Sequence, residues 1–273
     1  MSHSKTIPIT ELPQADASTL VDRAELERQV QAMYRSVARD PQAPRHFETG
    51  RGLALRLGYP ESLLDSVPAD AVASFAGVGY HLDLAALQPG DRVLDLGSGS
   101  GTDAFCAGAL VGEQGRVVGV DFTDAQVAKA QSLGARDGIR NVEFVEAGID
   151  DLPFDDAAFD VVISNGVVNL SPVKQLVFAE AGRVLRPGGR LAISDILSSS
   201  PLKEATRRNT ELWAACIAGA IPTSAYLDEL VAAGFAITAR RRNMYRFLSE
   251  RAREACRTYG VESTTVSATR EES

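Results

Sequence analysis

Short apolar runs alternate with longer segments of helical spacing through the second two thirds of the chain. Each run is short enough for a buried strand, and the segments between the runs carry apolar residues three and four positions apart. Strands that alternate with helices in this way form a parallel sheet with helices on both faces, so the pattern predicts a doubly wound α/β fold. The expected strands are Arg92–Leu96, Arg116–Val120, Val142–Val145, Phe159–Ser164 and Arg190–Ser194.

Two helices between these strands have clear end signals. The segment Gly101–Val111 is rich in Ala, and Ala125–Asp137 follows Thr123, a residue type that caps helix starts. A glycine follows each segment and favours the end of a helix there. Arg186–Gly189, with the sequence Arg-Pro-Gly-Gly, predicts a turn before the fifth strand.

The part of the chain before the first strand has helical patterns of its own. Residues 1–20 are polar and are expected to form a flexible tail, which leaves residues 21–89 as an N-terminal helical or lid region. Within that region, the glycine-punctuated and aromatic segment Ser74–Tyr80 is suited to a lid or a pocket wall. The expected helices are Val21–Val37, His46–Leu57 and Glu61–Val67.

The pattern continues after the fifth strand. Residues 90–273 are expected to form the core, and a helical cover insertion is expected at about residues 198–222. A helix, a strand, a second helix and a last strand should follow, because the segments again switch between helical and strand spacing. These elements are expected at Thr223–Ala233, Ala236–Arg242, Ser249–Tyr259 and Val261–Ala268.

A glycine-rich loop follows the first expected strand. Gly97, Gly99 and Gly101 stand at alternate positions between that strand and a helix. Glycines remove the side chains that would keep backbone N–H groups from a ligand, and the helix start adds the positive end of a dipole. Such a loop suits a ligand that carries a carboxylate or another anionic group.

Asp95 distinguishes this loop from a nicotinamide-binding fingerprint. That fingerprint requires G-x-G-x-x-G, whereas Thr102 occupies its last position here. A carboxylate two residues before the first glycine would repel a pyrophosphate and attract a cation. S-adenosylmethionine carries an ammonium, a sulfonium and a carboxylate but no phosphate, so D-x-G-x-G-x-G indicates the loop of a class I methyltransferase. A glycine turn in another α/β protein is the alternative.

Later strand ends add residues to the expected cofactor site. Asp121 lies roughly 20 residues after the glycine loop, where doubly wound folds place an acid on ribose hydroxyls. Ile149 follows the third strand and would frame an adenine, and Asn165 follows the fourth, beside the methionine portion. The residues expected to bind the cofactor are Asp95, Gly97, Ser98, Gly99, Asp103, Asp121, Phe122, Gly148, Ile149 and Asn165.

The composition and net charge of the chain indicate which kinds of binding partner to expect. The chain has 273 residues and a formal net charge of −8, which argues against nucleic acid and anionic membranes as partners and favours a small molecule. Neither a signal peptide nor a long apolar run is present, so a cytoplasmic protein is expected. The three cysteines are widely spaced and should be reduced. Composition gives no prediction of the oligomeric state.

From about Phe75 to Phe235, the chain resembles the arsenite methyltransferase branch of the class I S-adenosylmethionine-dependent methyltransferases. The resemblance implies a Rossmann-like sheet of seven strands with one antiparallel member, N-terminal helices and a helical insertion after strand 5. It also implies S-adenosylmethionine as the cofactor and methyl transfer as the reaction. The likeness rests on VLDLGSGSGTD, GRVVGVDFTDAQV, FDVVISNGVVNLSP, RVLRPGGRLAISDI and LWAACIAGA.

The arsenite family captures As(III) through several thiols, and most of the matching positions lack them here. Val78 and Gly166 stand where the family has cysteines, and only Cys216 matches. As(III) is a soft ion that needs two or three converging thiolates for tight binding. The sequence therefore predicts a methyltransferase that acts on another small molecule, with an arsenite methyltransferase as the alternative.

The acceptor site is less defined than the cofactor site. Methyl transfer is an in-line displacement that requires no metal, and a general base is needed only when the nucleophile starts out protonated. No catalytic residue can be assigned. The candidates for the acceptor pocket are Tyr80, His81, Trp213 and Cys216, with packing as the other role for each. An enzyme that cleaves or cyclises S-adenosylmethionine, or a non-catalytic binding protein, remains an alternative.

Overall fold

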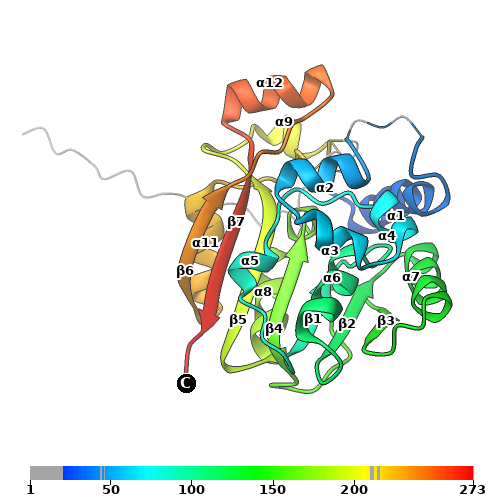
Figure 1. The fold of residues 1–273 in the computed structure, drawn as a ribbon. Coiled ribbons are helices and arrows are strands. Elements are labelled where there is room, and N and C mark those ends of the chain that lie inside the picture. Colours follow the sequence, from blue (N-terminus) through cyan, green and yellow to red (C-terminus); the bar gives the residue numbers. More distant parts are fainter. Residues whose placement is uncertain (1–20, 44, 46, 210–211, 214–215, 273) are drawn as a thin grey trace, which may run out of the picture.

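A single sheet of seven strands, in the order β3-β2-β1-β4-β5-β7-β6, runs through the molecule (Figure 1). The computed structural model describes residues 21–272 apart from 44, 46, 210–211 and 214–215, so the tail expected at 1–20 lies outside the described residues. The strands are β1 (Arg92–Leu96), β2 (Arg116–Asp121), β3 (Val142–Glu146), β4 (Phe159–Asn165), β5 (Leu185–Leu197), β6 (Phe235–Arg242) and β7 (Glu262–Arg270).

The pairing of the strands confirms the predicted fold. β1 pairs in parallel with both β2 and β4, and the parallel arrangement continues to β3 on one side and to β5 on the other. β7 is antiparallel to both β5 and β6. The sheet is therefore the expected doubly wound α/β sheet with one antiparallel member.

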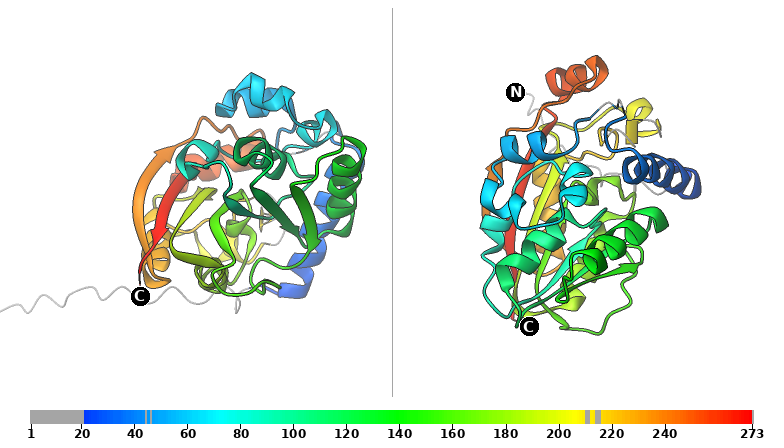
Figure 2. Two further views of the ribbon diagram at one scale, coloured as in Figure 1. Left: turned by 60° about the horizontal axis from the view of Figure 1, so that its bottom comes forward. Right: turned by 45° about the vertical axis from the view of Figure 1, so that its right-hand side comes forward.

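Helices cover both faces of this sheet (Figures 1 and 2). Before the sheet, the described residues form α1 (Arg23–Arg39), α2 (Arg51–Leu57), α3 (Glu61–Asp65), α4 (Ala69–Ala73) and α5 (Leu82–Ala85). The other helices are α6 (Thr102–Val111), α7 (Asp124–Arg136), the short 3-10 helix η2 (Val168–Leu170), α8 (Lys174–Val184), α9 (Glu204–Arg207), α11 (Thr223–Ala232) and α12 (Glu250–Tyr259).

Alternation along the strands divides the core into two apolar clusters. Successive strand residues point to opposite faces. Val93 of β1 belongs to a buried cluster with Phe105 of α6, whereas the next residue, Leu94, belongs to one with Phe178 of α8. A third cluster joins α1 to the segment after β5 through Leu26 and other buried residues.

The structure corrects several boundaries, and three of them have a clear local reason. Arg186–Gly189 do not form a turn before β5, because β5 already begins at Leu185 and the irregularity is taken up by a register shift against β4. α2 begins at Arg51 because Gly50 has φ 90°, which breaks the helix expected from residue 46. The cap of α11 is Pro222, and Thr223 is its first helical residue.

The order of the strands reverses between β1 and β4. β2 and β3 follow β1 on one side, and β5 follows β4 on the other, so the crossovers diverge at this point. Ligands of doubly wound sheets bind in the crevice that forms there, beyond the carboxyl ends of the strands. Among the helices that the structure describes, none is both long and apolar enough to cross a membrane.

Candidate functional site

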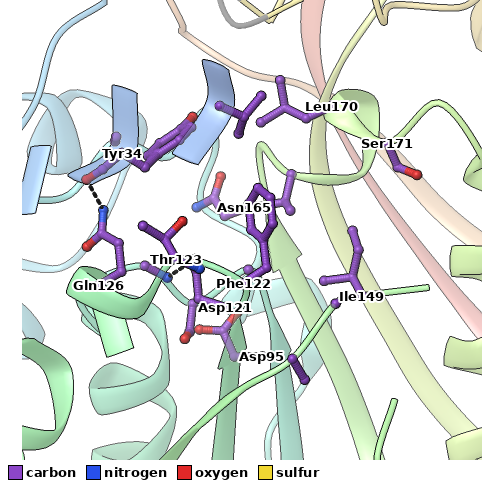
Figure 3. A pocket seen from close by; sticks show the side chains of 18 of the residues that line it. Tyr34, Asp95, Asp121, Phe122, Thr123, Gln126, Ile149, Asn165, Leu170 and Ser171 are labelled. Atoms are coloured by element: carbon purple, nitrogen blue, oxygen red, sulfur yellow. Dashed lines mark hydrogen bonds between the residues drawn. The ribbon is translucent and has the colours of Figure 1, made fainter. Parts of the chain in front are cut away.

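A cavity of about 340 Å³ lies at the carboxyl ends of β1, β2 and β4. Its floor includes Asp95 and the glycine loop, and α1 contributes Leu26, Val30 and Tyr34 to its wall. Figure 3 shows these elements around the cavity, with Asp95 on one side and Tyr34 on the other. The volume falls in the range of small-molecule sites, so the cavity is the candidate functional site.

Acidic side chains near the carboxyl ends of β1 and β2 line this cavity. Asp95 is 1% exposed, and its Oδ2 atom has no hydrogen-bond partner among the described residues. Burial raises the pKa of Asp95 well above its usual value, and the nearby charges of Asp103 and Asp121 raise it further. The backbone N–H of Ala104 is the one hydrogen-bond donor to this carboxyl among the described residues, so its ionised form is costly, and a cation bound beside it would reduce that cost.

Asp121 holds the glycine loop in place. One carboxylate oxygen accepts a hydrogen bond from the Gly99 N–H at 3.0 Å, and the other accepts one from the Thr123 N–H at 2.8 Å. Burial raises the pKa of Asp121, although both N–H groups favour its charged form. The carboxylate keeps free lone pairs, so it can also accept from a ligand hydroxyl.

The glycines of the loop are required by backbone conformation and by close packing. Gly97 and Gly99 have φ values of 70° and 53°, a region that side chains disfavour. A Cβ on Gly97 would collide with Val167, whereas a Cβ on Gly99 would find its nearest atom 3.9 Å away. The neighbouring Ser98 hydroxyl lacks a partner within the described structure. The loop therefore leaves polar groups and space for a ligand.

Asn165, at the end of β4, joins the loop to the segment before β1. Its Oδ1 atom accepts hydrogen bonds from the N–H groups of Val78 and Gly79 at 2.8 and 3.2 Å. Its Nδ2 atom donates to Oδ2 of Asp103 at 3.0 Å. The side chain fixes two walls of the cavity at once.

The helix α1 covers the cavity from above. Gln31 donates to the carbonyl of Phe122 at 2.9 Å, and Gln126 of α7 donates to the carbonyl of Tyr34 at 3.0 Å. An ion pair between Arg23 and Asp150, 2.7 Å long, ties the start of the helix to the segment after β3. These contacts place an apolar helix face over the acidic floor.

Every residue expected to bind the cofactor lines this cavity. In the sequence these residues stand at strand ends and in a glycine loop, and the fold brings them together at the carboxyl ends of the strands. They are Asp95, Gly97, Ser98, Gly99, Asp103, Asp121, Phe122, Gly148, Ile149 and Asn165.

The four candidates for the acceptor pocket do not line the cavity. Tyr80 packs on the ring of Tyr59, with 4.6 Å between the ring centroids. His81 is fully buried, and burial lowers its pKa. Trp213 is also buried, and its indole N–H donates to the carbonyl of Arg207 at 2.6 Å.

Cys216 lies behind the cavity wall. Burial and the charge of Asp195 raise the pKa of its thiol to about 12, and the thiol hydrogen-bonds with Tyr34, which does line the cavity. The group is therefore a protonated thiol at neutral pH. Val78 belongs to the same buried cluster, and a Cβ on Gly166 would lie 3.3 Å from Cγ1 of Val78.

Several residues of the site had no signal in the sequence. Tyr34 lies on an amphipathic helix, Gln126 in the first turn of α7, and Ser171 directly after the 3-10 helix η2. Their positions in the sequence look like ordinary surface or core positions of these elements. Only the packing of α1 and η2 over the strand ends brings them to the cavity.

Comparison with known proteins gives a consistent result. The family model described as "Methyltransferase domain" matches residues 87–251. An arsenite methyltransferase of Halobacterium salinarum is 44% identical over 191 residues, which are 69% of this chain and 48% of that protein. A 2-phytyl-1,4-beta-naphthoquinone methyltransferase of Arabidopsis thaliana is 42% identical over 121 residues, covering 41% of this chain and 44% of that protein.

A solved structure extends this similarity. An arsenic(III) S-adenosylmethionine methyltransferase from Chlamydomonas reinhardtii superposes with a TM-score of 0.62 and 31% identity, covering 82% of this chain and 74% of that one. The chain spans about half the length of the curated arsenite methyltransferases that it matches.

The loss of folding free energy that comes from burying the Asp95 carboxylate can be measured. Because the pKa of Asp95 is raised in the folded state, the folded protein binds more protons than the unfolded chain, and stability should fall as pH rises. Asp95→Asn should therefore raise the free energy of unfolding by about 1–3 kcal/mol near pH 8, and by less near pH 5. Urea denaturation followed by circular dichroism measures both values.

Asp124→Asn is the matched control. Arg35 lowers the pKa of this exposed carboxyl, so its loss should slightly destabilise the protein. Equal stability of the Asp95→Asn variant and the wild type at both pH values would contradict the expected cost.

Proposed function

The chain belongs to the methyltransferase domain family, in the branch related to the arsenite methyltransferases, and we propose that it transfers the methyl group of S-adenosylmethionine to a small molecule. The observation that carries this proposal is the buried carboxylate of Asp95, whose Oδ2 atom has no hydrogen-bond partner among the described residues, beside a glycine loop at the reversal of strand order. A cationic ligand without phosphate suits such a floor.

The residues of the cavity suit this cofactor in charge and in kind. Asp95 and Asp103 would face the ammonium group of S-adenosylmethionine. The backbone N–H groups of the glycine loop would donate to its carboxylate. Asp121 would accept from the ribose hydroxyls. The adenine would be framed by Phe122, Ser98, Gly148 and Ile149. Asn165 would lie near the methionine portion of the cofactor.

The role of the chain in the reaction is to position the cofactor and the acceptor and to exclude water. S-adenosylmethionine carries a methyl group already activated by its sulfonium, so chemistry requires mainly that the acceptor be held in line with that group. The helices before the sheet, residues 21–89, act as the cover, and residues 90–273 hold the cofactor. Exclusion of water by α1 would strengthen the electrostatic interactions within the cavity.

The apolar part of the cavity wall indicates the kind of acceptor. Leu26, Val30, Phe75, Val167 and Leu170 line it. These side chains suit a small molecule with an apolar surface better than a highly charged one. Among the similar proteins, one is named a 2-phytyl-1,4-beta-naphthoquinone methyltransferase and another a C-methyltransferase of ubiquinone/menaquinone biosynthesis.

An arsenite methyltransferase is the second candidate, because arsenite enzymes are among the similar proteins. Two observations weigh against it. The thiol of Cys216 is protonated and lies behind the cavity wall, and the adjoining positions Val78 and Gly166 supply no second thiol. An enzyme that cleaves or cyclises S-adenosylmethionine is distinguished by its product, since methylthioadenosine indicates cleavage and S-adenosylhomocysteine indicates transfer.

Titration calorimetry with S-adenosylmethionine, S-adenosylhomocysteine and NAD tests the cofactor. We expect saturable binding of the first two. Asp121→Ala should weaken this binding by roughly 10- to 100-fold, because it removes a charged acceptor and frees Gly99. Asp137→Ala, an exposed change at the far end of α7, should leave the affinity unchanged. Saturable binding of NAD alone would contradict the assignment.

A separate assay tests the acceptor. Wild-type protein incubated with arsenite, S-adenosylmethionine and excess thiol should yield no methylated arsenic by chromatography with elemental detection, because one protonated thiol cannot hold As(III) tightly. If arsenite were nevertheless the substrate, Cys216→Ser should abolish turnover and leave cofactor binding intact, and Gly166→Cys should tighten arsenite binding. Ready formation of mono- or dimethylarsenic by the wild type, lost in Cys216→Ser, would make arsenite the substrate.

A further inference from the structure

We propose that Tyr59 is a positioning residue that holds the carboxylate of Asp103 toward the ammonium group of the cofactor's methionine portion. The inference rests on the proposed function, since it concerns the same cavity. Tyr59 itself does not line the cavity, whereas Asp103 does. The residue belongs to the turn between α2 and α3, so the N-terminal helices would contribute to cofactor binding without touching the cofactor.

The hydrogen bonds around Asp103 fix both of its oxygens. The Tyr59 hydroxyl donates to Oδ1. Nδ2 of Asn165 donates to Oδ2 at 3.0 Å and also to the Tyr59 hydroxyl oxygen at 3.1 Å. The three side chains form a closed triangle that sets the plane of the carboxylate.

This arrangement leaves part of Asp103 available to a ligand. An ionised carboxylate has about four lone-pair positions, and the two hydrogen bonds use two of them. Because Asp103 lines the cavity beside Asp95, the remaining positions can serve a cation there. Without the Tyr59 hydroxyl, one oxygen would lose its donor and the carboxylate could rotate away from the cavity.

Tyr59 is well held for this task. It is 2% exposed, and its ring packs against Phe75 at 5.0 Å and against Tyr80 at 4.6 Å between centroids. Burial, with the negative charge of Asp103 beside it, raises the pKa of Tyr59 well above its usual value. The hydroxyl therefore keeps its proton and remains a donor at all ordinary pH values.

Ligand selectivity separates positioning from a merely structural role. S-adenosylmethionine and S-adenosylhomocysteine both carry the ammonium group, whereas 5′-methylthioadenosine keeps the adenosine and the sulfur but lacks the amino-acid portion. A loss of orientation at Asp103 should affect only the first two ligands. A general loosening of the fold should weaken all three.

The experiment is titration calorimetry of full-length Tyr59→Phe with these three ligands. The variant keeps the ring and its packing and removes only the hydroxyl. We expect the affinities for S-adenosylmethionine and S-adenosylhomocysteine to fall about tenfold, and the affinity for 5′-methylthioadenosine to stay within about twofold of the wild type.

Tyr226→Phe is the matched control. Tyr226 is also a fully buried tyrosine, and its hydroxyl donates to a buried carboxylate, Asp195, at 3.2 Å. It packs against α8 on the other face of the sheet and does not line the cavity. Its loss should reduce thermal stability to a similar extent while all three affinities stay unchanged.

A double-mutant cycle gives a second, independent measurement. Asp103→Asn should show the same selective loss, and the Tyr59→Phe/Asp103→Asn protein should lose little more than Asp103→Asn alone, because both changes act on one contact. Additive losses would overturn the proposal. So would unchanged affinities in Tyr59→Phe, or an equal loss for all three ligands.

The same titrations distinguish a failure of the proposed function from a failure of the role proposed for Tyr59. If the wild type bound neither S-adenosylmethionine nor S-adenosylhomocysteine, both the function and the role of Tyr59 would be wrong. If the wild type bound both and Tyr59→Phe bound them equally well, only the role of Tyr59 would be wrong.

Discussion

The burial of several carboxylates at one sheet edge is the constraint on which the rest of the site depends. Asp95, Asp103 and Asp121 line a single covered cavity. Backbone N–H groups compensate Asp121, and side-chain donors compensate Asp103. Asp95 keeps an oxygen without a partner among the described residues. The free protein therefore carries an electrostatic cost that a cationic ligand removes, and this links the stability of the fold to its function.

Much of the sheet and its acidic floor could be predicted from the sequence because their signals are local. Buried parallel strands have continuous apolar sequences. β1 spans Arg92–Leu96, the range predicted from its apolar run. Glycines with positive φ and the acids beside them lie within a few residues of each other. The turn expected before β5 at Arg186–Gly189 was wrong, since Leu185 already pairs with Phe159 of β4, and these four residues lie inside β5 as an unpaired irregularity before pairing resumes at Arg190.

The cover and the positioning contacts could not be predicted because their partners are distant in the sequence. Tyr59 meets Asp103 across 44 residues and Asn165 across 106. The sequence predicts Trp213 and Cys216 as acceptor-pocket candidates, yet in the fold both belong to a buried cluster and neither lines the cavity. Local spacing indicates which side chains face inward, and only the packed fold decides which of these reach a cavity.

Proton release on binding tests the central claim most directly, because it reports the ionisation of Asp95 itself. Calorimetry of S-adenosylmethionine binding in buffers of different ionisation enthalpy, between about pH 5 and 7, keeps the ligand's ammonium protonated. If the cation ionises a carboxylate that is neutral in the free protein, binding should release up to about one proton, tighten as pH rises, and lose this dependence in Asp95→Asn. Binding without proton release, or with proton uptake, would contradict the account.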